Sequence, residues 1–193
     1  MEQTNTTSKS DAPEYLDSSV EENAKIVQNT VNTVVKQYSE DLDDLMEDLM
    51  TALIGEEAIS TDAAERYYAE LTNMVYFVSS KVETLNIYSD ISKATAKEAY
   101  NKYYLTYCGE KDEKGKSLRT VAENTALAED GSRYEATVNI VYEHAYKTLK
   151  AKVDAANEMI TTLKNIIKKR VQEAYLSAGM LNNTTQNPVG IDD

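Results

Sequence analysis

The feature that most constrains this chain is a heptad pattern of apolar residues, which recurs in three long segments and steps alternately by four and three residues. The first stripe comprises Val31, Val35, Tyr38, Leu42, Leu45, Leu49 and Ala52. The second comprises Ala64, Tyr68, Leu71, Val75, Val78, Val82 and Leu85. The third comprises Tyr142, Tyr146, Leu149, Val153, Ala156, Ile160, Leu163 and Ile167. This spacing is typical of helices that pack along narrow seams.

The pattern predicts an all-α fold, an elongated helical hairpin or bundle with coiled-coil-like heptad seams and disordered termini. Six glycines, two prolines and no tryptophan in 193 residues argue against a β-sandwich, which needs many turns. We predict a disordered acidic lead over 1–17, one all-helical domain over 18–179 and a flexible tail over 180–193. Inside the domain we expect an acidic helix at 18–55, a helical arm at 62–107, a short helix at 118–129 and a long helix at 132–178.

Short capping signals set these boundaries. A Ser, Thr or Asp followed three residues later by Glu matches the capping box, which satisfies unpaired N–H groups at a helix start. The signals are Ser18–Glu21 or Ser19–Glu22, Asp62–Glu65, Thr120–Glu123 and Ser132–Glu135. Gly55 and Gly179 are expected to end helices, and "NIYSDIS" is expected to break or bend the arm around 86–89. The charged loop "CGEKDEKGKS" should be exposed and mobile.

Several classes of protein are disfavoured by what the sequence lacks. No apolar run approaches the roughly 20 residues that span a membrane, and the first residues do not resemble a signal peptide. Cys108 is the only cysteine, so no intrachain disulfide can form and a cytoplasmic location is expected. His144 is the only histidine, which excludes a metal site built from several histidines.

Catalysis is not expected. No phosphate-binding glycine loop or calcium loop occurs, and Cys108 has no evident base beside it. The abundant carboxylates lie along helix faces and do not converge on one position. We therefore predict a protein without enzymatic activity, cofactor or metal.

The acidity is concentrated in the first third of the chain. The formal net charge is −13, and residues 1–60 hold 14 acids and 3 bases, whereas residues 111–193 hold 12 of each. Six carboxylates lie off the first stripe, and we call them the acidic face: Glu40, Asp41, Asp43, Asp44, Glu47 and Asp48. One interpretation is a solvated outer face. The other is a binding surface for a basic partner, in this chain or another, because like charges one turn apart repel.

Two basic groups are candidates for nucleic-acid binding, because Lys and Arg hold phosphates and aromatic rings stack on bases. The first group lies in the arm and the following loop: Lys93, Lys97, Tyr100, Lys102, Tyr103, Tyr104 and Arg119. The second, which we call the basic helix end, comprises Lys164, Lys168, Lys169 and Arg170. The alternatives are that the tyrosines pack at the helix boundary and that the terminal cations complement the helix dipole.

The third stripe is also a candidate for self-association, through Tyr146, Leu149, Val153, Ala156, Ile160, Leu163 and Ile167. β-Branched residues alternate there with Leu or Ala, which favours a parallel two-stranded coiled coil. A seam inside an antiparallel bundle would have a similar pattern, so both arrangements remain open.

The order of features from Tyr88 to Tyr175 resembles one known family. A Lys/Tyr-rich helix is followed by a short charged loop, the small helix "SLRTVAENTALAED" and a long helix ending in "TLKNIIKKRVQEAY". This order is similar to that of the UvsY-like recombination mediators of T4-type bacteriophages, which help to load a recombinase onto single-stranded DNA. The resemblance rests on helix order and general character over somewhat less than half of the chain.

The resemblance implies an oligomeric, non-catalytic phage or prophage accessory protein in the cytoplasm of a bacterial host. It implies contacts to single-stranded DNA and to a recombinase, and it assigns binding roles to Arg119, Glu123 and the basic helix end. Residues 1–60 depart from the family, and their carboxylates would mask the basic helices or hold the basic surface of the recombinase. The alternative is an acidic coiled-coil adaptor or virion-associated structural protein that binds no nucleic acid. A weaker third possibility is that the acidic helix mimics DNA.

Overall fold

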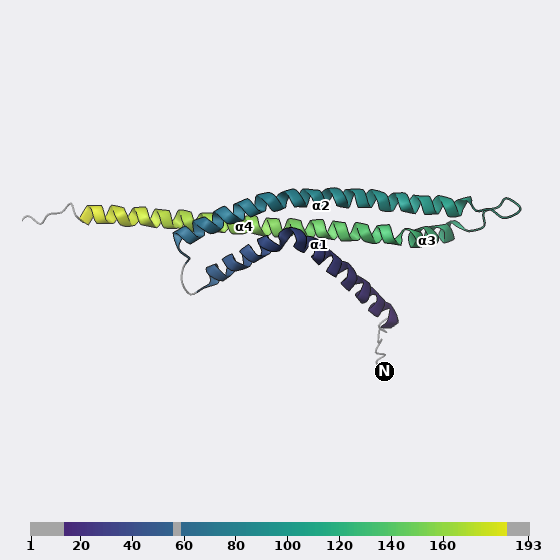
Figure 1. The fold of residues 1–193 in the computed structure, drawn as a ribbon, viewed down its shortest axis with the longest axis horizontal. Coiled ribbons are helices and arrows are strands. Elements are labelled where there is room, and N and C mark those ends of the chain that lie inside the picture. Colours follow the sequence, from purple (N-terminus) through teal and green to yellow (C-terminus); the bar gives the residue numbers. More distant parts are fainter. Residues whose placement is uncertain (1–13, 56–58, 185–193) are drawn as a thin grey trace, which may run out of the picture. The chain divides into compact units, whose positions relative to one another are not determined.

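The computed structural model describes residues 14–55 and 59–184, and within these ranges it contains four helices and no strand. They are α1 (Glu14–Ile54), α2 (Thr61–Gly109), α3 (Val121–Gly131) and α4 (Arg133–Thr184), as Figure 1 shows. The predicted all-α class is confirmed. The chain forms two compact units. Unit 1 combines the described residues up to Val35 with Leu85–Ala145, and unit 2 combines Lys36–Thr84 with the described residues from Tyr146 onward.

Unit 2 has the larger apolar core, and the heptad stripes supply it. Burying Leu, Val and Ala side chains away from water is the main favourable contribution to folding. The buried apolar residues of this unit are Leu42, Leu49, Ala64, Leu71, Val78, Val82, Leu149, Val153, Ala156 and Leu163. The other stripe residues of this unit are half-buried. The stripes therefore face the interior, whereas their coiled-coil geometry stays a prediction.

Unit 1 has a smaller and more polar interior. Its buried apolar residues are Val31, Val35, Leu85, Ala128 and Ala145. Three polar residues, Ser92, Asn124 and Ser132, are buried beside them. Most of these polar groups find partners: the Ser132 hydroxyl donates to Ala128 O at 2.8 Å, and the Ser92 hydroxyl donates to Ser89 O at 2.9 Å. Hydrogen bonding is what makes such burial tolerable.

The two predicted caps in the first half of the chain are wrong. Helix α1 begins at Glu14, so Ser18 and Ser19 lie inside the helix and residues 14–17 are not part of a disordered lead. The lead over residues 1–13 lies outside the described residues. Helix α2 is capped by Ser60, whose hydroxyl accepts from Ala63 N at 3.1 Å, and not by Asp62. Gly55 follows the last residue of α1, as predicted.

The break predicted around residues 86–89 is also wrong, because α2 is continuous from Thr61 to Gly109. The segment contains polar residues but neither glycine nor proline, so no backbone constraint interrupts the helix. Leu85 is fully buried, and Asn86 and Ser89 are half-buried. Packing along one side therefore continues through the polar segment.

The capping box at Thr120 is confirmed, because Thr120 and Glu123 make both of its hydrogen bonds. Helix α3 begins directly after it, three residues later than predicted. The capping box at Ser132 is wrong, because the Ser132 hydroxyl bonds back to α3 and forms that helix's C-cap. Helix α4 continues through Gly179 to Thr184, since a single glycine weakens a helix without ending it. The tail over residues 185–193 lies outside the described residues.

The loop between α2 and α3 is exposed, as predicted, and it forms a defined turn. The Asp112 carboxylate accepts from Lys114 N at 2.9 Å and from Lys116 N at 2.8 Å. Gly115 adopts a φ of 75°, a left-handed conformation that glycine reaches without a steric cost. The side chains of Lys111, Lys114 and Lys116 project from this turn into solvent.

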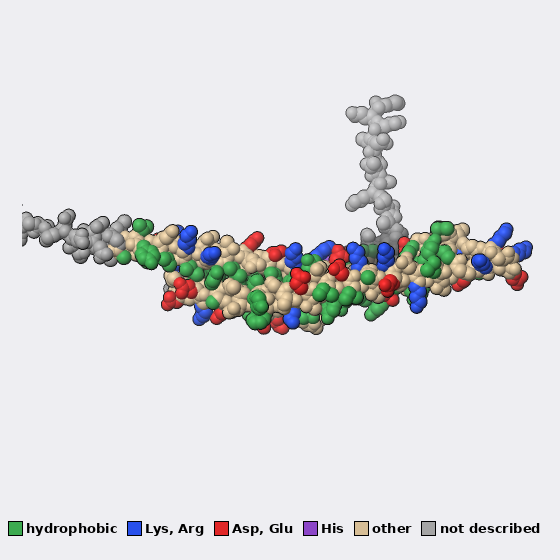
Figure 2. All heavy atoms as spheres, turned by 90° about the horizontal axis from the view of Figure 1, so that it is seen from above, with side chains coloured by type: hydrophobic (Ala, Val, Ile, Leu, Met, Phe, Trp, Pro, Cys, Tyr) green, Lys and Arg blue, Asp and Glu red, His purple; other side chains and the backbone are tan. Residues whose placement is uncertain are grey.

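Large apolar side chains remain at the surface, and Figure 2 shows such side chains among the charged ones on one face. On α2 the exposed ones are Tyr76, Phe77, Ile87, Tyr88, Ile91 and Leu105. Over residues 14–55 and 59–184, none of the helices combines the length and the apolar character that crossing a membrane requires.

Candidate nucleic-acid interface and acidic face

Four of the predicted nucleic-acid-binding residues share one side of α2. Lys93, Lys97, Tyr100 and Tyr104 are spaced by four, three and four residues, which places them in one row along a helix. Both lysines are exposed and both tyrosines are half-buried. The two rings stack with centroids 6.1 Å apart and an angle of 16° between their planes. We call this row the Lys/Tyr face.

A polar cluster at the end of the Lys/Tyr face was not predicted. The Asn124 amide donates to Cys108 Sγ at 3.4 Å, and Asn124 itself is 2% exposed. A side-chain hydrogen bond with Cys108 raises the pKa of the Tyr104 hydroxyl above its ordinary value of 10.0. The contact between Cys108 and Asn124 could not be predicted from local spacing, because the two residues lie on different helices.

The remaining residues of the arm lie elsewhere. Lys102 follows Lys93 by about 2.5 helical turns and is therefore on the opposite side of α2, although it is exposed. Tyr103 packs against α3, since a Cβ atom built on Gly131 would lie 2.9 Å from the Tyr103 ring. Tyr103 also stacks on Tyr107, with centroids 6.4 Å apart. Tyr103 therefore packs between helices, as the alternative interpretation expects, and its ring is less suited to stacking on a base.

Arg119 is occupied by contacts inside unit 1. Its guanidinium donates to the Glu110 carboxylate and lies 5.5 Å from the centroid of the Tyr107 ring. Both partners come from the end of α2 and the residue after it. Glu123, the other residue of the small helix in the phage-family resemblance, is engaged in the cap with Thr120. Both side chains therefore have a role in holding the loop and α3 together.

The basic helix end belongs to unit 2, whereas the Lys/Tyr face belongs to unit 1. Lys164, Lys168 and Lys169 are exposed and Arg170 is half-buried. Lys169 Nζ lies 3.9 Å from Oε1 of Glu173, which is one turn further along α4. Because α4 continues to Thr184, these cations stand well before the end of the helix, so complementing the helix dipole does not account for them.

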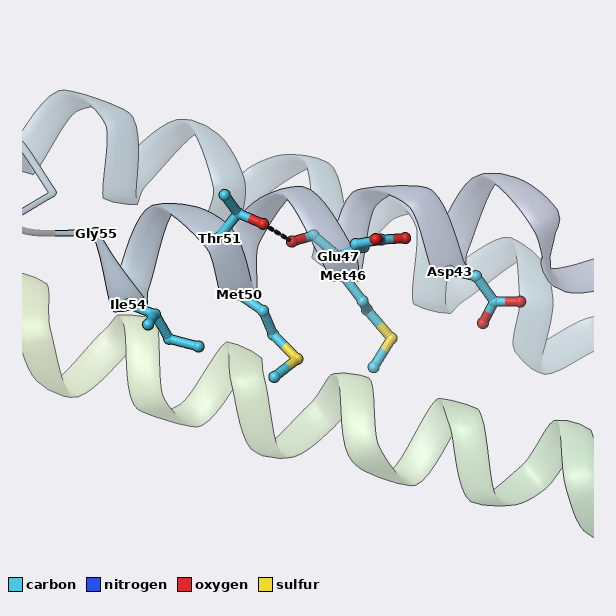
Figure 3. Close-up of a pocket in the computed structure, with 7 residues that line it drawn as sticks. All are labelled: Asp43, Met46, Glu47, Met50, Thr51, Ile54 and Gly55. Atoms are coloured by element: carbon cyan, nitrogen blue, oxygen red, sulfur yellow. Dashed lines mark hydrogen bonds between the residues drawn. The ribbon is translucent and has the colours of Figure 1, made fainter.

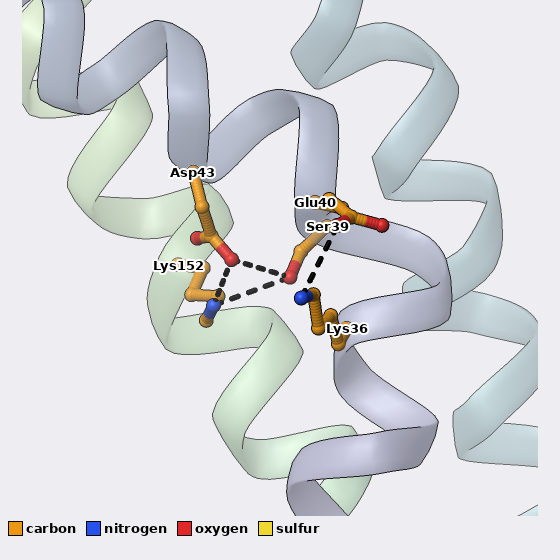
Figure 4. Close-up of polar contacts among 5 residues, drawn as sticks. All are labelled: Lys36, Ser39, Glu40, Asp43 and Lys152. Carbon is orange, nitrogen blue, oxygen red and sulfur yellow. Dashed lines mark hydrogen bonds and ion pairs between the residues drawn. The ribbon is translucent and has the colours of Figure 1, made fainter.

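The acidic face is exposed at five of its six positions. Lys36 pairs with Glu40 at 3.2 Å along the helix. Asp43 is the exception, because it is half-buried and pairs with Lys152 of α4 (Figure 4). Ser39, fully buried, donates to Asp43 Oδ2 at 2.9 Å and accepts from Lys152 Nζ at 3.2 Å. The expectation of a solvated face is thus wrong for Asp43, whose basic partner lies in this chain.

A groove of about 580 Å³ borders the acidic face along the last turns of α1. Its apolar side chains are Met46, Met50 and Ile54, which are one turn apart and point the same way in Figure 3. Met50 is 48% exposed and Ile54 is 77% exposed. Asp43 and Glu47 line the same groove. We call it the methionine groove, and the unbranched side chains of Met46 and Met50 can adapt to an apolar partner surface.

The predicted self-association seam lies inside unit 2. Leu149, Ala156 and Leu163 are fully buried and Val153 is 8% exposed within the single chain. The other three, Tyr146, Ile160 and Ile167, are half-buried. The chain itself therefore covers this seam, and it is not a free surface for a second copy. Self-association as such stays a prediction.

No group of three or more His, Cys, Asp or Glu side chains is placed to hold a metal ion within residues 14–55 and 59–184. Comparisons with protein-family models, with curated proteins and with solved structures give no match.

Proposed function

We propose that this protein is a non-catalytic helical accessory protein that binds single-stranded DNA, of the recombination-mediator type found in phages and prophages. The observation that supports this proposal best is the Lys/Tyr face, where two exposed lysines are followed along one row by two stacked tyrosine rings. Self-association and a recombinase partner belong to the same proposal.

The row matches the chemistry of a single strand. Lys93 and Lys97 are one turn apart and both exposed, so their ammonium groups suit neighbouring phosphates. Tyr100 and Tyr104 supply ring surfaces, and stacking a base on an aromatic ring is worth about 1–3 kcal/mol. The basic helix end would add phosphate contacts from unit 2. Such binding weakens steeply with salt, because it releases counterions from the strand.

The test is fluorescence anisotropy of a labelled single-stranded oligonucleotide titrated with the full chain at low and high salt. The double variant Lys93→Gln/Lys97→Gln should weaken binding and reduce the slope of log K against log salt by about 1.4, which is about 0.7 for each lost phosphate contact on a single strand. The control is Lys25→Gln/Lys150→Gln, which changes the net charge equally at exposed positions outside the proposed site. If both variants lost the same affinity for the oligonucleotide, binding would depend only on the net charge of the protein, which would contradict the proposal.

The acidic face provides a second test, because its carboxylates would mask the basic surface. Removing α1 is unsuitable, since Leu42 and Leu49 are fully buried in the core of unit 2. Neutralising Asp41, Asp44 and Asp48 to Asn keeps the core and should raise DNA affinity. The matched control is Glu65→Gln/Glu70→Gln/Glu158→Gln, which removes the same charge from exposed positions elsewhere. The same affinity in both variants would contradict masking.

A second candidate function is an adaptor that binds a basic protein and no nucleic acid. The observation that favours it is the methionine groove beside the acidic face, because apolar anchors with a carboxylate rim suit a basic amphipathic helix. The probe is a synthetic Leu/Lys amphipathic peptide, and Met46→Ser/Met50→Ser should weaken its binding. Peptide binding together with no binding of the oligonucleotide would favour the adaptor over the mediator.

A further inference from the structure

A pocket of about 330 Å³ lies between α2 and the first turns of α4 in unit 1, away from the Lys/Tyr face. Four of its residues come from α2 and four from α4. We call it the tyrosine pocket, and it is lined by Tyr88, Ile91, Ser92, Thr95, Tyr134, Glu135, Val138 and Tyr142. None of these residues belongs to the proposed DNA-binding or acidic surfaces.

Aromatic rings and aliphatic side chains form most of the wall. The rings of Tyr88 and Tyr142 meet edge to face, with centroids 5.5 Å apart and an angle of 61°. Tyr134 is 76% exposed although it lines the pocket, so it stands at the rim. Ile91 and Val138 add apolar surface. A wall of this kind suits a ligand with an aliphatic portion, and the π-faces of tyrosines attract cations.

One polar atom in this wall lacks a partner. Oε2 of Glu135 is buried and accepts no hydrogen bond from any described residue. Glu135 lies in the first turn of α4. A buried carboxylate oxygen without a donor is costly, so such an atom marks a place where a donor from outside would gain much.

The hydroxyl groups of the pocket's serine and threonine do not fill this role. Ser92 Oγ donates to Ser89 O at 2.9 Å and lies 3.4 Å from Asn139 Oδ1. Thr95 Oγ1 donates to Ile91 O at 3.0 Å. Both protons are therefore directed to other acceptors. A ligand that presents N–H or O–H to Glu135 and apolar surface to the walls would supply the missing donor.

We propose that the tyrosine pocket binds an alkylammonium group, which donates to Glu135 Oε2 and lays its methylene chain against Ile91 and Val138. An ammonium fits better than a neutral alcohol, because it both neutralises the carboxylate and is attracted by tyrosine rings. A metal ion fits less well, since Glu135 is the only carboxylate among the lining residues. The group can come from a free amine or from the lysine side chain of a protein.

The experiment titrates the isotopically labelled full chain with n-pentylamine and follows the backbone amide resonances of Ser92, Thr95 and Glu135. Binding in the millimolar range is expected, and 1-pentanol, which has the same length without the charge, should bind at least tenfold more weakly. Glu135→Gln should weaken pentylamine at least tenfold, whereas the control Glu98→Gln, exposed on α2, should leave it unchanged.

A second variant tests the pocket at a position where substitution should not disturb the fold. Tyr134→Ala removes a mostly exposed ring, so it should keep the fold while weakening pentylamine severalfold. Nα-acetyl-lysine methylamide distinguishes the two sources: tighter binding than pentylamine points to a protein lysine, and weaker binding points to a free amine. Equal binding of pentanol and pentylamine, or unchanged binding by Glu135→Gln, would overturn the proposal.

Discussion

Lys152 of α4 pairs with Asp43 of α1, and the buried hydroxyl of Ser39 bonds to both. This contact joins residues 109 positions apart in the sequence. It removes one carboxylate from the acidic face and uses it to hold two helices of unit 2 together. Of the other five carboxylates, Glu40 pairs with Lys36 along the helix, and Asp41, Asp44, Glu47 and Asp48 are exposed to a partner.

The Asp43–Lys152 pair should contribute measurably to stability. A double-mutant cycle with Asp43→Asn and Lys152→Met should give a coupling of about 1 kcal/mol in urea unfolding, because the pair is partly shielded and shares a third group. The control cycle on the exposed pair Lys36–Glu40 should give about 0.3 kcal/mol and lose more of it in salt. Equal couplings would mean that the contact with Ser39 adds nothing.

Gly131→Ala should destabilise unit 1 by about 1–3 kcal/mol, because the added methyl group overpacks the site. The new Cβ would lie 2.9 Å from Cγ and Cδ1 of Tyr103, close to the ring's attachment and hard to move. Thermal unfolding measures the effect. Gly109→Ala is the control, since no atom lies within 4 Å of its Cβ position and stability should not fall. A neutral Gly131→Ala would show that the Tyr103 ring can shift freely.

Thr120→Ala should cost about 1 kcal/mol of stability, the usual loss when a helix N-cap is removed. The Thr120 hydroxyl accepts from Glu123 N at 3.3 Å, and its backbone N–H donates to the Glu123 carboxylate at 2.7 Å. Because α3 has only 11 residues, its amide protons should exchange with solvent faster in the variant. Thr125→Ala in the same helix, which removes no cap, is the comparison. Unchanged exchange rates in Thr120→Ala would contradict a role for the cap.

Acidification should weaken the same cap. The hydrogen bond from the Thr120 backbone lowers the pKa of Glu123 below its ordinary value of 4.5, with further contributions from the Thr120 hydroxyl and from Arg119. A lowered pKa in the folded state means that Glu123 stabilises the protein above the unfolded pKa, and that this stabilisation is lost as pH falls through the folded pKa. Chemical-shift titration of Glu123 measures the shift directly. Thr120→Ala keeps the backbone N–H and removes only the hydroxyl, so the pKa of Glu123 should rise part of the way toward 4.5, and an unaltered titration would show that the hydroxyl contributes nothing to the shift.

Leu163→Ala should destabilise unit 2 by about 2–5 kcal/mol, because the residue is fully buried in the single chain. The fall in melting temperature should not depend on protein concentration, since no second copy is needed to bury this side chain. Leu176→Ala, at a position 65% exposed, should change stability by less than about 0.5 kcal/mol. A melting temperature that rises with concentration only in the unmodified protein would instead place Leu163 in an interface between copies.

The sequence by itself determined the helical class, the inward stripes and one cap. Val31, Leu42, Leu71 and Leu149 are buried as their spacing predicts, because period and apolar character are local properties that decide which side of a helix faces inward. The cap at Thr120 followed for the same reason, since both of its partners lie within one helical turn.

Tertiary structure decided the partners of polar groups that lie far apart in the sequence. Asp43 has the composition of a solvated face yet pairs with Lys152, 109 positions away. Arg119 could not be assigned to Glu110 from sequence, because a guanidinium can pair with any carboxylate the fold brings near. Likewise, a seam that packs inside one chain and a seam that joins two chains follow the same heptad rule, and only the burial of Leu149 and Leu163 within a single chain separates them.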